Sequence, residues 1–151
     1  LEPQLRGWFS QPDPFNWDLG RFSFAPDARR FDNGTPSYLP YAASLPGLKW
    51  QLATGSPAIR AHNLRLSHRL MDIADTHRLK LASPRDDERR GGTVVIEVPA
   101  STTPAALQRA LMADGVVCDT RGNRMRWSPG LVTTLEALEV LDKSLGRLLA
   151  G

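Results

Sequence analysis

The chain has 151 residues, of which 41% are hydrophobic and 23% are charged, and its formal net charge is +3. This length suits one domain with a single core, and the composition is typical of a soluble globular protein. No apolar run approaches the roughly 20 residues that span a membrane, and no signal peptide is recognisable, so we expect a cytoplasmic protein without a membrane partner. The first residue, Leu1, is not Met, which favours an excerpt or a processed product.

The charge and the metal-binding residue types exclude further classes. Basic residues are interspersed with acidic ones, as in "SPRDDERRGG", so a solvated surface explains the charge and we expect no nucleic-acid partner. The single Cys118 excludes an internal disulfide and suits a reducing compartment. His62, His68 and His77 are not spaced to place two rings on adjacent turns, so we expect no metal site.

Residues 1–40 are rich in proline, glycine and aromatic residues and show little periodicity. A structureless stretch of this length is unusual in a compact domain, and its large rings are too many for a solvated linker. The rings are Trp8, Phe9, Phe15, Trp17, Phe22 and Phe24. We therefore expect the segment to pack against a partner.

The stretch "RRFDNGTP" at residues 29–36 has two interpretations. Asn33-Gly34 favours a tight turn with positive φ, and Thr35 before Pro36 can cap a new helix. Alternatively, glycine lets a backbone approach a ligand closely, and a threonine hydroxyl beside free amides suits a phosphate. The stretch alone leaves both interpretations open.

Two helices are predicted next. The first covers residues 38–53 and is interrupted near Pro46-Gly47. Gly55 ends it, and Ser56-Pro57 begins the second helix with serine as the cap. The second helix runs over residues 58–79, with apolar residues at three- and four-residue spacing: Ile59, Leu66, Leu70 and Ile73.

The remainder predicts a small α/β lobe at about residues 80–151. "GGTVVIEVP" is a strand, and "STTPAALQRALMADG" is a capped helix that ends at Gly115. "VVCDTR" and "RMRWS" are strands joined by the turn "RGN", and "TTLEALEVLDKSLGRLL" is an amphipathic closing helix. This order describes a sheet covered by helices.

Three stretches, "GWF", "RRFDNGTP" and "VVCDTRGNRMRWSP", resemble in that order the C-terminal portion of kynureninase and related class V aminotransferase-fold enzymes. The resemblance implies a pyridoxal-phosphate (PLP) enzyme of the α/β aspartate aminotransferase fold, PLP fold type I, that forms homodimers. It implies that residues 1–55 end the large cofactor-binding domain, that residues 56–79 form a connecting helix, and that residues 80–151 form the small domain.

The resemblance also implies site residues. Trp8 matches a tryptophan near the cofactor phosphate, and Phe9 matches an aromatic residue that lines the substrate pocket. Gly34 and Thr35 match a Gly-Thr pair whose hydroxyl contacts the phosphate, commonly across the dimer, while Asn33 lies at the pocket edge.

Arg126 matches the family's arginine that binds the α-carboxylate of an amino-acid substrate. The chemistry suits the residue type, because a planar guanidinium binds a carboxylate through two parallel hydrogen bonds and so fixes the orientation of the substrate.

The family's Schiff-base lysine is not recognisable in this chain. Lys49, Lys80 and Lys143 lie in or beside predicted helices without a family motif, so we expect the lysine to precede Leu1 and the chain alone to be inactive. The chain has Ser10-Gln11 where kynureninase has Gly-His, so we expect an aminotransferase or a kynureninase-like lyase or hydrolase without assigning the substrate.

A rival hypothesis is a non-catalytic α/β interaction module that docks a partner through residues 1–55. Cys118 invites comparison with cysteine desulfurases, but its place in a predicted strand favours a buried structural thiol.

Overall fold

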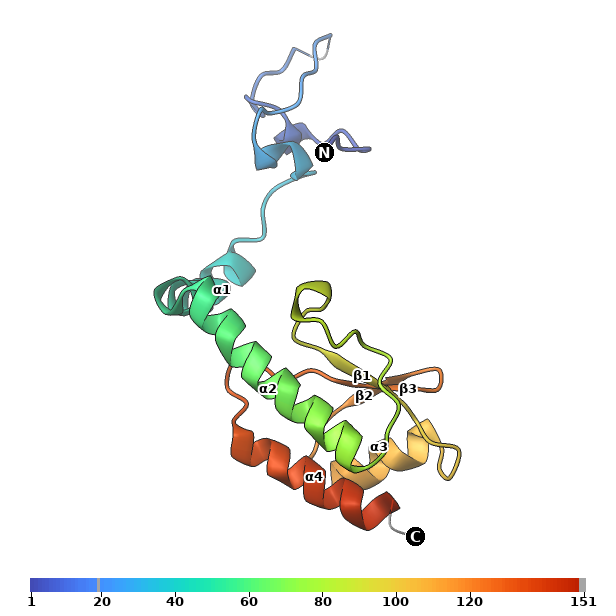
Figure 1. Ribbon diagram of the computed structural model, residues 1–151. Helices are drawn as coiled ribbons and strands as arrows, with labels where there is room; N and C mark the ends of the chain where they lie inside the picture. Colours follow the sequence, from blue (N-terminus) through green and yellow to red (C-terminus); the bar gives the residue numbers. More distant parts are fainter. Residues whose placement is uncertain (19, 150–151) are drawn as a thin grey trace. The chain divides into compact units, whose positions relative to one another are not determined.

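The computed structural model describes residues 1–18 and 20–149 (Figure 1). The chain divides into two compact units, with the boundary between Trp50 and Gln51. The assignment of residues 1–55 to the end of a cofactor-binding domain stays a prediction.

The second unit packs helices against one face of a three-stranded antiparallel sheet (Figure 1). The strands lie in the order β1-β3-β2, so β3 is central and pairs with both neighbours. The predicted order of strand, helix, strand, strand and helix is confirmed. The elements of this unit are α2 (Ser56–Thr76), the short 3₁₀ helix η3 (Asp87–Arg89), β1 (Val94–Glu97), α3 (Pro104–Ala113), β2 (Asp119–Arg121), β3 (Arg124–Trp127) and α4 (Leu135–Leu149).

The core of this unit follows from side-chain periodicity. Along β3, Met125 and Trp127 are buried, whereas Arg124 and Arg126 are exposed on the other face. The helices contribute apolar residues at three- and four-residue spacing to the same cluster. The side chains that are least exposed in the cluster are Leu66, Leu70, Ile73, Val94, Ile96, Leu111, Met125 and Leu145.

Helix α2 confirms the predicted long helix, with Leu66, Leu70 and Ile73 buried as expected. The predicted serine cap is wrong, because Ser56 is already helical and the preceding Gly55 makes no side-chain cap. Gly55 has φ 81°, a left-handed conformation that glycine adopts without a steric penalty, and it connects two helices with no further linker.

Helix α3 and the β2-β3 hairpin also confirm the sequence predictions. The side chain of Thr103 accepts a hydrogen bond from the amide of Ala106, and Gly115 with φ 81° follows the end of the helix. Gly122, with φ 56°, forms the turn between the two strands. The Thr103 cap and the two glycines thus fix where helix α3 begins and ends and where the hairpin turns.

An ion-pair network joins α2 to α4. Arg69 donates hydrogen bonds to Glu139 at 3.0 Å and to Asp142 at 2.6 Å, and Nε2 of His77 lies 2.7 Å from Asp142 Oδ1. Burial raises the pKa of Asp142, but the hydrogen bonds from His77 and Arg69 outweigh it, and the net pKa is below the ordinary value. The network therefore favours the charged carboxylate between the helices.

The first unit contains two short 3₁₀ helices, η1 (Trp8–Ser10) and η2 (Ala28–Phe31), and most of α1 (Tyr38–Thr54). The predicted interruption of α1 is wrong, since the helix runs through Pro46. A proline removes one backbone hydrogen bond, which a helix of this length can lose without ending. No residue of α1 is buried.

None of the helices among residues 1–18 and 20–149 combines the length and the apolar character needed to cross a membrane.

Replacing Leu145 in α4 tests the core of the second unit. Leu145→Ala should lower the free energy of unfolding by about 2–5 kcal/mol, because the side chain is fully buried and its loss leaves a cavity. Leu148→Ala, on the same helix, removes a side chain that is 39% exposed and should cost about 1 kcal/mol or less. Urea denaturation of both variants measures the difference, and equal losses would contradict this core.

Candidate functional site

The backbones of Gly7 and Asn33 approach each other closely in the first unit. A Cβ built on Gly7 would lie 2.2 Å from the carbonyl oxygen of Asn33 and 2.3 Å from its Cα, so no other residue fits without moving the chain. This contact brings the stretch "GWF" against the stretch "NGT", which lie far apart in the sequence.

A buried serine holds the η1 turn that carries Trp8. Ser10 Oγ accepts a hydrogen bond from the Gly7 amide at 2.7 Å and donates to the Gly7 carbonyl at 2.6 Å. The Ser10 carbonyl accepts a hydrogen bond from the amide of Ala25 at 2.8 Å. Ser10 and Ala25 are both buried, so this small polar junction fixes the position of Trp8.

The aromatic rings of the first unit pack on one another. The Trp8 ring meets Phe9 and Phe15 edge to face, with centroids 4.5 and 5.9 Å away. Phe22 and Phe24 form a second such pair at 4.9 Å. Trp8 nevertheless stays 43% exposed and Phe15 63% exposed, so the rings do not form a closed core.

The donors around the Gly7-Asn33 contact fit an anionic oxygen group. Among the described residues, the Trp8 indole N–H, the Thr35 hydroxyl and the amides of Gly34 and Thr35 have no hydrogen-bond partner within the protein. A Cβ built on Gly34 would lie 3.7 Å from Trp8 Nε1, so the absence of a side chain leaves space beside the indole donor. Such a set of open donors suits a phosphate.

Gly34 does not adopt the positive φ that the sequence favours, which is a correction. In the described part of the chain, glycines with positive φ are Gly55, Gly115 and Gly122. At position 34 an added Cβ would make an ordinary van der Waals contact with Trp8 Nε1, so neither a left-handed turn nor a steric overlap requires glycine there.

The arginines before this stretch build the preceding turn. Arg29 binds Asp27 through Nε at 3.1 Å, and Arg30 donates to the carbonyls of Pro26 and Asp27 at 2.6 and 3.0 Å. Their N–H groups therefore hold the start of η2, and they contact residues 26 and 27.

Arg126 lies on the exposed face of β3 and is paired with Asp119. The two residues are directly opposite in the β2-β3 register, and Arg126 donates from Nε at 2.7 Å and from Nη2 at 2.5 Å to the two carboxylate oxygens. Hydrogen bonds from Arg126 lower the pKa of Asp119, and those to Asp119 raise the pKa of Arg126. Arg126 belongs to the second unit, whereas Trp8, Phe9, Asn33, Gly34 and Thr35 belong to the first.

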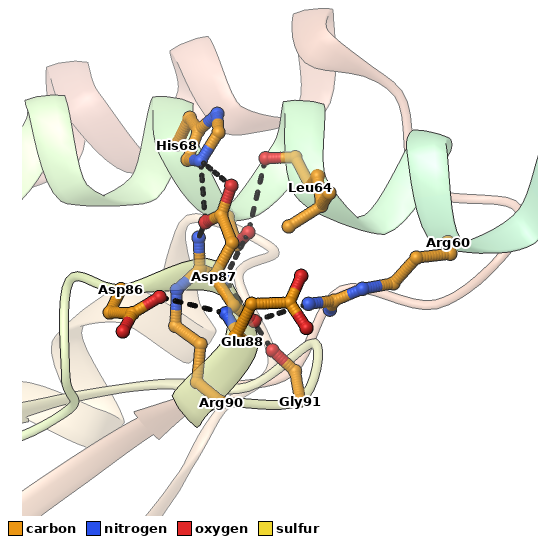
Figure 2. Close-up of polar contacts among 9 residues, drawn as sticks. Arg60, Leu64, His68, Asp86, Asp87, Glu88, Arg90 and Gly91 are labelled. Carbon is orange, nitrogen blue, oxygen red and sulfur yellow. Dashed lines mark hydrogen bonds and ion pairs between the residues drawn. The ribbon is translucent and has the colours of Figure 1, made fainter.

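A second polar cluster fastens η3 to α2 (Figure 2). His68 Nε2 lies 2.8 Å from Asp87 Oδ1, and the carboxylate also pairs with Arg90, whose side chain is only 2% exposed. Arg90 donates to Ser67 at 2.6 Å, and Arg60 donates to the backbone carbonyl of Asp87. The Asp87 carboxylate is paired with His68 and Arg90, so we assign the cluster a structural role.

A cavity of about 380 Å³ in the second unit contains none of the predicted site residues. Its lining includes Trp127, Leu141 and Cys118.

Cys118 lies just before β2, not within a strand as predicted, and is half-buried. Burial raises the pKa of its thiol, and Sγ lies 3.6 Å from Met125 Sδ, which fits a structural thiol.

Among the described residues there is no group of His, Cys, Asp or Glu side chains that could hold a metal ion.

Comparison with known proteins identifies the family. The kynureninase C-terminal domain matches residues 59–141, more than half of the chain. The chain belongs to this family. The resemblance to the C-terminal portion of class V aminotransferase-fold enzymes is therefore confirmed.

The similarity to two curated relatives extends beyond residues 59–141 of this chain. Isopenicillin N epimerase of Streptomyces clavuligerus is 30% identical over 158 residues, which cover 98% of this chain and 40% of the relative. The uncharacterized aminotransferase YcbU of Bacillus subtilis (strain 168) is 26% identical over 138 residues, which cover 91% of this chain and 35% of the relative. The chain thus spans less than half the length of these relatives.

A solved structure confirms the predicted fold class. The apo structure of a cysteine desulfurase from Thermococcus onnurineus NA1 matches 99% of this chain and 40% of its own length, with a TM-score of 0.80 and 20% identity. The chain therefore has the fold of the corresponding part of a PLP fold type I protein.

Sequence reasoning missed Gly7, Ser10 and Asp119. Gly7 opens the stretch "GWF" and Ser10 follows it, but the sequence assigned neither a role, because the Gly7 contact is with Asn33 and the Ser10 carbonyl binds Ala25. Asp119 could have been found, since a hairpin turning at Gly122 places it opposite Arg126 on the same face of the sheet.

Replacing Gly7 tests the contact that gathers the donors. Gly7→Ala should move residues 33–35 away from Trp8, because the added Cβ overlaps the Asn33 backbone. The ¹H–¹⁵N NMR spectrum of the 151-residue chain should show altered signals for the Trp8 indole and for the amides of Gly34 and Thr35. Gly47→Ala, where nothing lies within 4 Å of the added Cβ, is the matched control and should leave these signals in place. Unchanged signals in Gly7→Ala would refute the contact.

Proposed function

We propose that this chain is the C-terminal part of a PLP-dependent enzyme that acts on an α-amino acid, as an aminotransferase or a kynureninase-like lyase or hydrolase. The observation that carries the proposal is the Gly7-Asn33 contact, which gathers open donors at Trp8, Gly34 and Thr35 in a member of this family. A non-catalytic module would have no need of such a donor set.

Each predicted residue has a role that suits its chemistry. Trp8 and Thr35 donate hydrogen bonds to the cofactor phosphate, and the Gly34 backbone lets that phosphate approach. Phe9 and Asn33 line the substrate pocket, and Arg126 binds the substrate carboxylate through its guanidinium. When bound, PLP supplies an electron sink for negative charge that develops at the substrate Cα.

The catalytic lysine belongs, in this proposal, to the part of the enzyme outside this chain. Lys49 lies in α1, Lys143 lies in α4, and Lys80 pairs with Glu97 at 3.0 Å on the sheet. None of the three lies in the first unit's 33–35 turn or in η1. The chain by itself is therefore inactive, although it supplies phosphate and carboxylate contacts.

No single reaction is assigned to the complete enzyme, since the names of the similar proteins include an epimerase, an aminotransferase and a cysteine desulfurase. One cofactor could serve each of these reactions, because the orientation of the bound amino acid decides which bond at Cα is broken.

We also propose that the complete enzyme is a cytoplasmic homodimer. Helix α1 supports the need for further protein around this chain, because it has no buried residue and carries large apolar side chains on more than one side. Those that are at least half exposed are Tyr38, Leu39, Tyr41, Leu45, Leu48, Trp50 and Leu52. A helix that is apolar all round is normally enclosed.

Replacing Thr35 tests the phosphate contact. Thr35→Val keeps the shape of the side chain and removes the hydroxyl, so the Kd for PLP of the full-length apoenzyme should rise about tenfold, as for a hydrogen bond to a charged group. Thr76→Val is the control, since its hydroxyl donates to the Asp72 carbonyl at 2.8 Å within α2. Absorbance titration with PLP measures the Kd of both variants. If Thr35→Val binds PLP as tightly as Thr76→Val does, Thr35 does not contact the phosphate.

Replacing Arg126 tests the carboxylate contact. The full-length holoenzyme is first assayed with the twenty standard amino acids and with kynurenine to identify a substrate, and turnover of none of them would count against the proposed function. With that substrate, Arg126→Ala should raise KM at least about tenfold, because a bidentate charged contact is lost. Arg85→Ala, which breaks a similar Arg-carboxylate pair with Asp75, should leave KM unchanged. An unchanged KM in Arg126→Ala would contradict the role.

A further inference from the structure

The Arg126 guanidinium uses only one of its edges within the protein. Its Nε and Nη2 donate side-on to Asp119, at 2.7 and 2.5 Å. Among the described residues, Nη1 has no hydrogen-bond partner. A second carboxylate can therefore bind end-on, through Nη1 and the remaining N–H of Nη2, without displacing Asp119.

The sheet face around this pair keeps a positive balance despite Asp119. Alternation along the hairpin puts Arg121, Arg124 and Arg126 on the same face as Asp119. Glu97, on β1, pairs with Lys80 at 3.0 Å, and Arg121 shares Asp119 at 3.3 Å. An arriving carboxylate thus meets excess positive charge rather than a neutralised pair.

Asp119 also restrains a side chain that would otherwise sample many rotamers. Arg126 is 43% exposed and Asp119 is 36% exposed, so burial alone does not fix either side chain. Their position directly opposite each other on adjacent strands lets two parallel hydrogen bonds set the plane of the guanidinium. This plane decides the direction in which the free edge points.

We propose that Asp119 is a positioning residue for substrate binding: it holds the Nε edge of Arg126 so that the opposite edge of the guanidinium is presented to the α-carboxylate of the substrate. This inference rests on the proposed function, because it assigns a partner to the same arginine.

The test compares Asp119→Asn with the full-length holoenzyme, using the amino acid identified in the substrate assay. Asparagine keeps the shape but removes the charge and one acceptor, so KM should rise about three- to fivefold, as for an exposed ion pair, with kcat changed less than about twofold. Asp75→Asn, which breaks the bidentate pair with Arg85, is the matched control and should leave KM unchanged.

A double-mutant cycle separates positioning from a general structural role. In an Arg126→Ala background, Asp119→Asn should add no further increase in KM, because the group that Asp119 orients is already absent. An additive increase would show that Asp119 acts independently of Arg126 and would overturn the inference. A decrease of KM in the single Asp119→Asn variant would also overturn it, since Asp119 would then compete with the substrate.

The side-chain NMR signal of Arg126 gives a readout that needs no turnover. In the 151-residue chain the Arg126 Nε–H should be protected from exchange with water, and Asp119→Asn should remove this protection while Asp75→Asn should not. If Arg126→Ala raises KM but Asp119→Asn changes neither KM nor the exchange, the positioning role fails while the proposed function stands. If Arg126→Ala leaves KM unchanged, the proposed carboxylate contact itself fails.

Discussion

The alternation of side chains along β3 is the constraint on which the second unit depends. Because neighbouring residues of a strand point to opposite faces, burying Met125 and Trp127 obliges Arg124 and Arg126 to face outward. A shift of one residue would put two arginines into an apolar core. The same alternation, combined with the turn at Gly122, sets Asp119 opposite Arg126. The register of the hairpin therefore determines both which side chains enter the core and which charged side chains face outward.

The first unit is organised by a different constraint, the close approach of two backbones. It has little regular structure apart from α1, and its rings remain partly exposed. What positions Trp8 is the absence of a side chain at Gly7, together with the two hydrogen bonds of Ser10. Such a junction depends on backbone geometry more than on burial, so it can present open N–H groups without covering them. That property suits a surface that holds an anion.

Local sequence patterns predicted the helices and strands of the second unit well, because the features that begin and end these elements act between neighbours in the chain. The spacing of Leu66, Leu70 and Ile73 and the glycines at 115 and 122 each act through neighbours in the chain. The errors arose where the geometry of neighbouring elements decided the outcome: Ser56 is the first residue of α2 and not its cap, and α1 tolerates Pro46. For the candidate site, the family resemblance supplied Trp8, Thr35 and Arg126. The role of Gly7, which opens the stretch "GWF", could not be predicted because its contact with Asn33 is non-local.

The burial of Trp127 gives the two units separate optical signatures. Of the four tryptophans, Trp8, Trp17 and Trp50 lie in the first unit and are 43%, 76% and 51% exposed, whereas Trp127 is 3% exposed in the second unit. A buried indole fluoresces at shorter wavelength than a solvated one, because no mobile water surrounds it to reorient around its excited state. Unfolding of the second unit therefore shifts the emission of Trp127 to the red, whereas the other three indoles belong to the first unit. Intrinsic fluorescence can follow the lobe by itself, without any label.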